Sequence, residues 1–177
     1  MKRGLLIFAV SFLILAVLSA RYFFCLSVFL TGDRLLLPVW VEKIDDGAYP
    51  FVAYLRYYNF IPVNELEHEK GKIVIKRFED GRIDFVSNAE EERHSRELML
   101  TYEIIPPSLF DPEQKEPNIR FASTVLRFSN KKTFSPAAVR YAVVYVNSQG
   151  RSLLAGLADG SGTMLVKELS LEAFRIR

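Results

Sequence analysis

The sequence predicts a mainly β protein, an antiparallel sandwich or small barrel with one short helix, preceded by an N-terminal transmembrane helix. Three observations predict this fold class. The first thirty residues are apolar, the remainder alternates β-branched and aromatic segments with tight-turn sequences, and one internal segment has a helical pattern. The 177 residues are enough for one span and one domain. We expect an anchor over residues 1–31 and an extracytoplasmic β-rich domain over residues 32–177.

The composition excludes several classes of protein. Hydrophobic residues make up 50% and charged residues 25% of the chain, which is unlike a disordered protein. The excess positive charge lies in the first thirty residues, which hold Lys2, Arg3 and Arg21 and no acid. Since the net charge is +2, the remainder carries about −1, and no nucleic-acid surface is expected. A single cysteine allows no internal disulfide.

The first segment has the length of a membrane span. Residues 4–20 carry no charge, Arg21 follows, and residues 22–30 are apolar again. Seventeen helical residues cover about 25 Å, slightly less than a hydrocarbon core, and a flanking arginine can extend the span. Cleavage as a signal peptide after Ala20 is the alternative, although Leu18 is larger than a cleavage site prefers.

The charges that flank this segment predict its orientation. Lys2 and Arg3 precede the apolar run, and the positive-inside rule keeps such a short end in the cytoplasm. We therefore expect a single-pass protein of the inner (cytoplasmic) membrane with a periplasmic or extracellular C-terminal domain. Arg21 is interpreted either as an interfacial anchor or as a charge that pairs with an acid on a partner helix.

The first half of the domain reads as strands and hairpins. Residues 34–42 predict a strand that Pro38 makes an edge or a bent segment, and residues 51–58 predict an aromatic strand. Residues 72–78 and 82–86, joined through Asp80-Gly81, are typical of a hairpin.

The second half continues this pattern after one helix. Residues 88–98 begin with acids and end with bases, as the helix dipole prefers, and predict a short solvated helix. Residues 111–118 form a polar loop with prolines. Further strands are expected at residues 98–105, 119–128, 139–146, 152–157 and 164–169, before a short helical tail. The strands at 139–146 and 152–157 are expected to form a hairpin, joined by Asn147-Ser148-Gln149-Gly150. Both alternating sets of residues 141–146 are largely apolar, so this strand should be central or covered on both faces.

No pattern of catalytic or metal-ligating residues is found. His68 and His94 lie far apart in charged segments and predict no metal site. An anchor followed by a β-rich outer domain is the layout of type I signal peptidases, which would need a Ser/Lys pair. Ser27 lacks the expected motif, and Lys72 and Lys76 read as solvated strand residues. We therefore predict neither a cofactor nor an enzymatic activity.

The strand at residues 51–58 resembles part of a known signature. Residues 52–57, VAYLRY, are similar to the end of the Gly-Asp-Tyr-x-x-Leu-x-Tyr motif of the GDYXXLXY family, with Leu55 and Tyr57 at the matching positions and Pro50, Phe51 and Val52 at the first three. The N-terminal span, the segment 35–39 and the distal VRYAVVYVNSQGRSLLAGLADG also resemble that family. The resemblance implies a small membrane-anchored protein beside polytopic membrane proteins, and it supplies no catalytic residue.

Two functions follow as hypotheses. The first is an accessory or assembly subunit of a membrane protein complex, whose helix lies in the lipid bilayer and whose domain docks on a polytopic membrane protein. Tyrosine and arginine dominate interface hot spots. The candidate interface residues are Arg21, Tyr54, Arg56, Tyr57 and Tyr58. The alternative is an anchored binding module for a small ligand or a cell-surface polymer, held in a barrel mouth or an aromatic groove.

Overall fold

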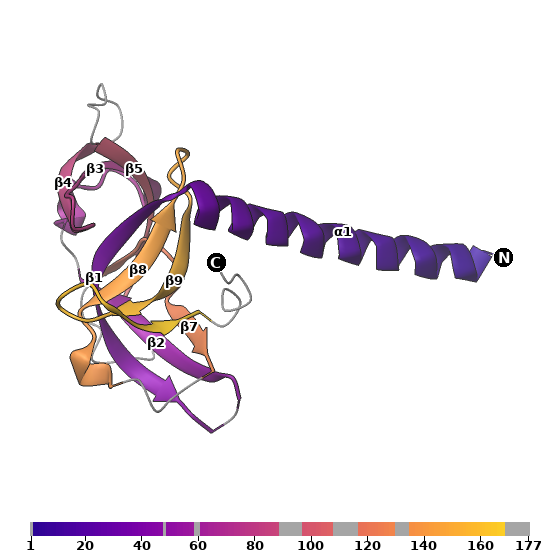
Figure 1. Cartoon of the computed structure of the whole chain (residues 1–177). Coiled ribbons are helices and arrows are strands. Elements are labelled where there is room, and N and C mark those ends of the chain that lie inside the picture. Colours follow the sequence, from indigo (N-terminus) through magenta and orange to yellow (C-terminus); the bar gives the residue numbers. More distant parts are fainter. Residues whose placement is uncertain are drawn as a thin grey trace.

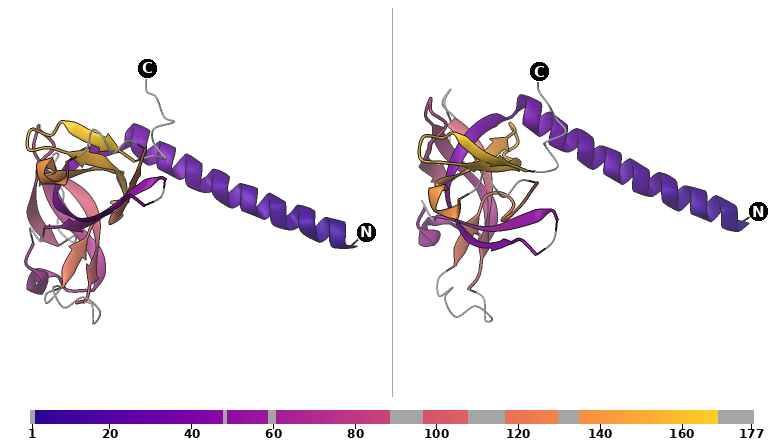
Figure 2. Two further views of the ribbon diagram at one scale, coloured as in Figure 1. Left: turned by 90° about the horizontal axis from the view of Figure 1, so that it is seen from below. Right: turned by 60° about the horizontal axis from the view of Figure 1, so that its bottom comes forward.

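The protein has one long N-terminal helix and a domain of two curled antiparallel sheets (Figure 1). The computed structural model describes residues 2–47, 49–58, 61–88, 97–107, 117–129 and 135–168. This arrangement confirms the predicted fold class. Figure 2 shows that the helix leaves the domain on one side and projects away from it.

Six strands form the first sheet, in the order β10-β9-β8-β1-β2-β7. The second sheet has four strands, in the order β4-β3-β5-β6. The first sheet contains β1 (Asp33–Asp45), β2 (Phe51–Tyr57), β7 (Val125–Phe128), β8 (Tyr141–Val146), β9 (Ser152–Ala158) and β10 (Met164–Lys167). The second contains β3 (Lys70–Arg77), β4 (Ile83–Asn88), β5 (Glu97–Ile105) and β6 (Asn118–Arg120), and two short 3-10 helices lie at η1 (Val63–Glu65) and η2 (Pro136–Ala138).

β1 is a central strand, so of the two alternatives for Pro38 the edge position is wrong, whereas the bent segment agrees with the curvature of β1 in Figure 1. Its first half pairs with β8 and its second half pairs with β2. Pro38 is the last residue of the β8 ladder, and pairing with β2 begins at Val39. Because proline lacks the N–H that a ladder needs, this change of partner is where a central strand can accept it.

The main core lies between the two sheets. Strand residues alternate between faces, so Leu35, Leu37 and Val39 enter this core while Leu36 enters a smaller cluster on the opposite face of the first sheet. β8 shows the same division, with Val144 in the core and Val143 in the smaller cluster. The prediction that this strand is covered on both faces is confirmed.

Local hairpin predictions are confirmed, whereas one predicted strand is divided. β3 pairs with β4 through a turn in which Gly81 has φ 86°, and β8 pairs with β9 through a turn in which Gly150 has φ 81°. Residues 119–128 form two strands, because β6 pairs with β5 in one sheet and β7 pairs with β2 in the other. The buried positions change accordingly from odd (Ile119) to even (Leu126).

Two predicted helical segments lie wholly or mainly outside the described residues. The predicted helix at 88–98 is described only at its ends, where Asn88 closes β4 and residues 97–98 begin β5. The predicted tail after residue 168 is not among the described residues. Most of the polar loop at 111–118 is also outside them.

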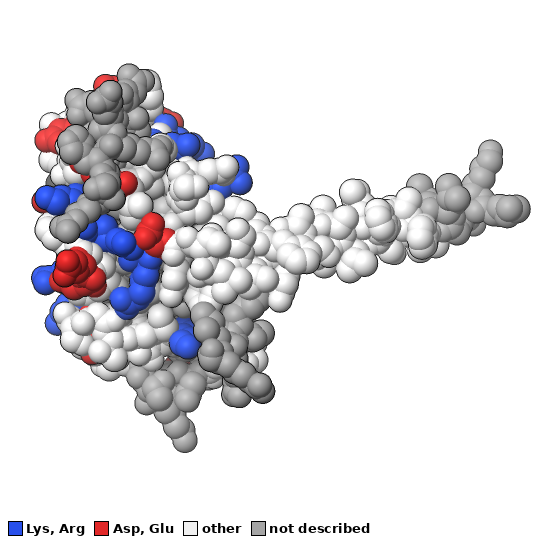
Figure 3. All heavy atoms as spheres, turned by 45° about the horizontal axis from the view of Figure 1, so that its top comes forward, with Lys and Arg blue, Asp and Glu red and all other residues white. Residues whose placement is uncertain are grey.

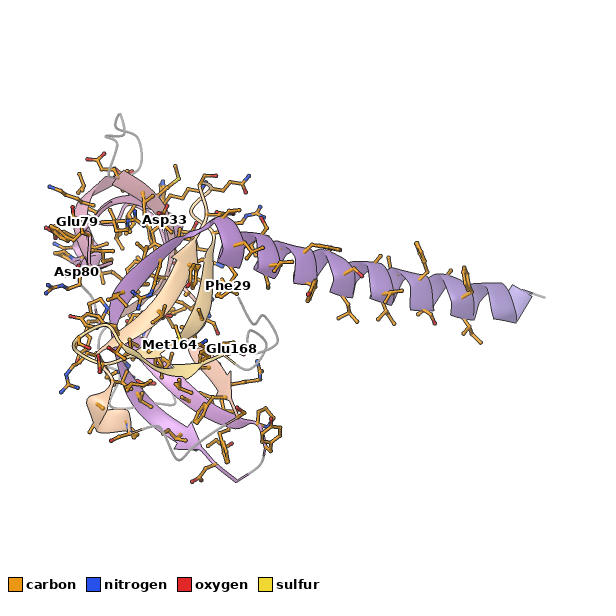
Figure 4. All side chains as sticks on the ribbon, viewed as in Figure 1. Phe29, Asp33, Glu79, Asp80, Met164 and Glu168 are labelled. Carbon is orange, nitrogen blue, oxygen red and sulfur yellow. The ribbon has the colours of Figure 1, made fainter. Side chains whose placement is uncertain are left out.

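α1 (Lys2–Thr31) is long and apolar enough to cross a membrane over residues 7–31. Its large side chains from Ile7 to Leu18 are exposed. Its last two turns contact the domain instead, since Val28 is buried and the Phe29 ring lies 4.8 Å from that of Tyr145. Figure 4 shows Phe29 between the end of α1 and the first sheet.

Gly32 joins this helix to β1 and tolerates no side chain. Its N–H donates to the Val28 carbonyl at 2.9 Å, and a Cβ there would lie 2.3 Å from that oxygen. The close contact at Gly32 therefore fixes the end of α1 relative to the start of β1.

A glycine in β9 provides a test of the sheet. A Cβ at Gly156 would lie 2.2 Å from the Val166 carbonyl oxygen, so Gly156→Ala must push β10 away. We expect the variant to lose about 1–3 kcal/mol of stability, a fall in Tm of about 3–10 °C measured by circular dichroism of the detergent-solubilised chain. Gly160→Ala is the control, because its nearest neighbour is 3.8 Å away. Equal Tm values for the two variants would contradict this account of β9 and β10.

Candidate functional site

An exposed cluster of aromatic and basic side chains lies on the outer side of β1 and β2. These strands pair antiparallel with Trp40 opposite Arg56. Alternation along β2 buries Ala53, Leu55 and Tyr57 and places Tyr54, Arg56 and Tyr58 on the other side. We call Trp40, Tyr54, Arg56 and Tyr58 the aromatic face.

The side chains at the centre of the aromatic face hold one another in place. The Trp40 and Tyr58 rings meet edge to face with centroids 4.4 Å apart, and the Arg56 guanidinium lies 5.5 Å above the Trp40 ring. Arg56 also forms an ion pair with Glu42 and keeps 22% of its side chain exposed. Edge-to-face rings and a stacked guanidinium each favour a fixed geometry.

The structure brings together three of the five residues that the sequence indicated. Tyr54 is 39% and Tyr58 50% exposed, and both lie with Arg56 on the aromatic face. Tyr57 is on the opposite side of β2, 1% exposed, where it packs edge to face against Phe121. Arg21 is elsewhere, on α1 one helical turn before Phe24, and its side chain is not described.

Trp40 and Glu42 belong to this site but were not singled out from the sequence. Trp40 is the only tryptophan of the chain and is two residues from Glu42 in a predicted strand. A charged residue within a strand marks the side that faces solvent, and residues two positions apart share a side. Arg56 therefore could have indicated that Tyr54 and Tyr58 face outward with it and that Tyr57 faces inward.

A pocket of about 630 Å³ lies where the two sheets and α1 meet. Its lining comes from the ends of several strands, from the crossing segment 121–124 between β6 and β7, and from Phe24 of α1. The lining includes one aromatic ring of α1, a serine of the crossing segment and four charged side chains: Phe24, Ser123, Lys70, Glu103, Arg120 and Arg151.

Hydrogen bonds fix the crossing segment that forms one wall of the pocket. The Tyr57 hydroxyl donates to the Ser123 carbonyl at 2.9 Å, and the Ser152 hydroxyl donates to the Phe121 carbonyl. The Leu55 N–H donates to the Thr124 carbonyl at 2.8 Å. Burial raises the pKa of Tyr57, an effect that the nearby charge of Arg120 partly opposes.

Cations outnumber acids in this pocket. Glu103 accepts ion pairs from both Lys70, at 2.6 Å, and Arg120. The Arg151 guanidinium lies 5.7 Å above the Phe24 ring, and no acid in the part of the chain that the structure describes forms an ion pair with it. One carboxylate therefore faces three cations, which makes the pocket attractive to an anion.

Neither metal nor Ser/Lys chemistry is supported by the arrangement of the described residues. No group of three or more His, Cys, Asp or Glu side chains among them could hold a metal ion. Lys72 and Lys76 are exposed on β3, so neither is the desolvated base that a Ser/Lys pair needs. Ser27 is likewise exposed on α1.

Comparison with known proteins adds no relative. No protein-family model matches the chain, and no curated protein or solved structure shows significant similarity to it.

Removal of the Tyr57 hydroxyl should destabilise the domain. Tyr57→Phe leaves the Ser123 carbonyl without its side-chain donor, which we expect to cost about 1 kcal/mol. Tyr58→Phe is the matched control, since Tyr58 is half exposed and should change stability by less than about 0.5 kcal/mol. Chemical denaturation of both full-length variants in detergent would measure this difference. An equal loss in the two would contradict a structural role for the Tyr57 hydroxyl.

The raised pKa of Tyr57 also predicts a pH dependence. Above the ordinary tyrosine value of 10.0 the unfolded chain releases the phenolic proton while the folded chain retains it. The stability that this group contributes is therefore complete below pH 10 and is lost as the pH rises toward the folded-state pKa. We expect the free energy of unfolding to fall less steeply with pH in Tyr57→Phe than in wild type between pH 10 and 11.5, measured by chemical denaturation at a series of pH values. Parallel pH profiles would be evidence against this linkage.

Proposed function

We propose that this protein is a membrane-anchored accessory or assembly subunit of a membrane protein complex. α1 anchors it in the cytoplasmic membrane with its N-terminus inside, and the β domain docks on the exported surface of a polytopic partner. The observation that carries this proposal is the aromatic face, where Trp40, Arg56 and Tyr58 are exposed in part and already ordered.

The distribution of charge supports the anchor. Figure 3 shows the described side chains of α1 as an uncharged surface, whereas basic and acidic side chains are mixed on the β domain. Lys2 and Arg3 at the start of the chain favour the cytoplasm for that end.

The aromatic face has the composition of a protein interface. Tryptophan, tyrosine and arginine are the residues most enriched among interface hot spots. Because Trp40 already contacts both Tyr58 and Arg56 in the free chain, docking orders few additional rotamers, and the entropic cost of binding is reduced. The pair between Arg56 and Glu42 offers both signs of charge to a partner.

The pocket favours a second function, that of an anchored binding module. Its volume of about 630 Å³ lies within the range of small-molecule sites, roughly 300–1,000 Å³. The pocket and the aromatic face share no residue, so the two functions are compatible in one domain.

Charge reversal on the aromatic face should release the partner. We expect Arg56→Glu to reduce at least fivefold the amount of a stoichiometric polytopic protein that co-purifies with the full-length chain in mild detergent, measured by quantitative mass spectrometry. The new carboxylate faces Glu42 and removes the cation above Trp40.

Two further variants make this test specific. Tyr54→Ala leaves the Arg56–Glu42 pair in place and should also weaken the complex, whereas Lys76→Glu on the second sheet should not. The Tm of each variant shows that the domain is folded. Recovery of wild-type chain without a stoichiometric partner, or an intact complex with folded Arg56→Glu, would overturn the proposal.

A further inference from the structure

The pocket lies at the level where α1 leaves the domain. Side chains of α1 are exposed at Tyr22 and Phe23, whereas Phe24 is half buried and lines the pocket. Residues 4–20 carry no charge and cover about 25 Å as a helix, and Arg21 follows them as a flanking residue that can extend the span to the interface. If α1 spans the bilayer as proposed above, with Arg21 at the interface, Phe24 lies one helical turn further from the hydrocarbon, and the pocket faces the lipid headgroups.

The cations of the pocket suit the phosphate of such a headgroup. Arg120 and Arg151 are guanidinium groups, which bind phosphate oxygens through two parallel hydrogen bonds, and Lys70 adds a third positive charge. Glu103 is shared between Lys70 and Arg120 and compensates for one of these charges. Once the surrounding water is displaced, an anion is needed to balance the two positive charges that Glu103 does not compensate.

Arg151 is held at the junction of the helix and the domain. Its guanidinium stacks over Phe24, with the ring 5.7 Å away, while its backbone N–H donates to the Asn147 side chain at 3.0 Å. The stacked face leaves the edge of the guanidinium, with its N–H donors, available to a ligand. The Arg151 side chain thus contacts α1 and lines the pocket at the same time.

We propose that this pocket binds the phosphate group of an anionic membrane phospholipid. Lys70, Arg120 and Arg151 contact the phosphate, and the Phe24 side of the pocket meets the glycerol and upper acyl chain. A lipid is favoured over a soluble phosphate compound because the wall formed by Phe24 belongs to the helix that lies in the bilayer. The inference rests on the membrane anchor of the proposed function but not on its protein partner.

Native mass spectrometry of the full-length chain in detergent tests this site. Titration with phosphatidylglycerol and, separately, phosphatidylcholine should show preferential retention of phosphatidylglycerol by wild type. Each cation near an anionic headgroup contributes about fivefold in affinity, so Arg120→Gln/Arg151→Gln should reduce the phosphatidylglycerol affinity at least tenfold. Lys43→Gln/Lys76→Gln removes the same charge from exposed positions outside the pocket and should bind as wild type does.

The single variant Arg151→Gln keeps the test valid if the double variant fails to fold, because it breaks no ion pair among the residues that the structure describes. Equal retention of both lipids by wild type, or an unchanged preference in folded Arg151→Gln, would overturn the proposal. Displacement of phosphatidylglycerol by an equal concentration of inorganic phosphate would assign the site to a soluble anion and overturn the lipid assignment.

The two proposals fail in distinguishable ways. Lipid retention is measured on the isolated chain, and the pocket variants leave the aromatic face unchanged, so loss of the protein partner does not affect this result. If alkaline pH released the wild-type chain from membranes, α1 would not be a membrane anchor, and both proposals would fail together.

Discussion

The burial of the first half of β1 on both of its faces is the constraint on which the remaining structure depends. Leu35, Leu37 and Val39 enter the core between the sheets, and Leu36 enters the cluster that Phe29 of α1 covers. A strand that alternates between two apolar environments cannot shift its register by one residue without exposing both sets. Because Gly32 connects β1 to α1 without room for a side chain, this register also positions the helix against the sheet.

The change of partner along β1 explains where the aromatic face lies. In the half that pairs with β8, both faces of the strand are buried, because α1 and its neighbours cover the outer side. In the half that pairs with β2, only the core side is covered. Trp40 is the first large side chain on the uncovered side, where it contacts Arg56 and Tyr58 from the neighbouring strand. The position of the proposed docking surface is thus a consequence of this strand arrangement.

The pocket depends on the crossing of the chain from one sheet to the other. Segment 121–124 leaves β6 and enters β7, and its carbonyl groups need donors because they leave the regular ladders. Tyr57 supplies one of these donors from the core, and Ser152, which lines the pocket, supplies another. The same pocket beside this segment is lined by Phe24 of α1 and by the basic residues Lys70, Arg120 and Arg151.

The sequence alone determined the features that local chemistry controls. A long apolar segment makes a helix, and Asp-Gly and Gln-Gly turns close hairpins around Gly81 and Gly150, because both depend on neighbouring residues. Strand alternation places Tyr57 on the opposite side of residues 51–58 from Tyr54 and Tyr58, a distinction that the sequence prediction did not draw. Which side meets the core was decided by pairing with β1 and β7, and so Tyr57 is buried while Tyr54 and Tyr58 are exposed. Tertiary contacts also decided three other features, because each depends on segments far apart in the chain. These are the central position of β1, the division of residues 119–128 and the pocket.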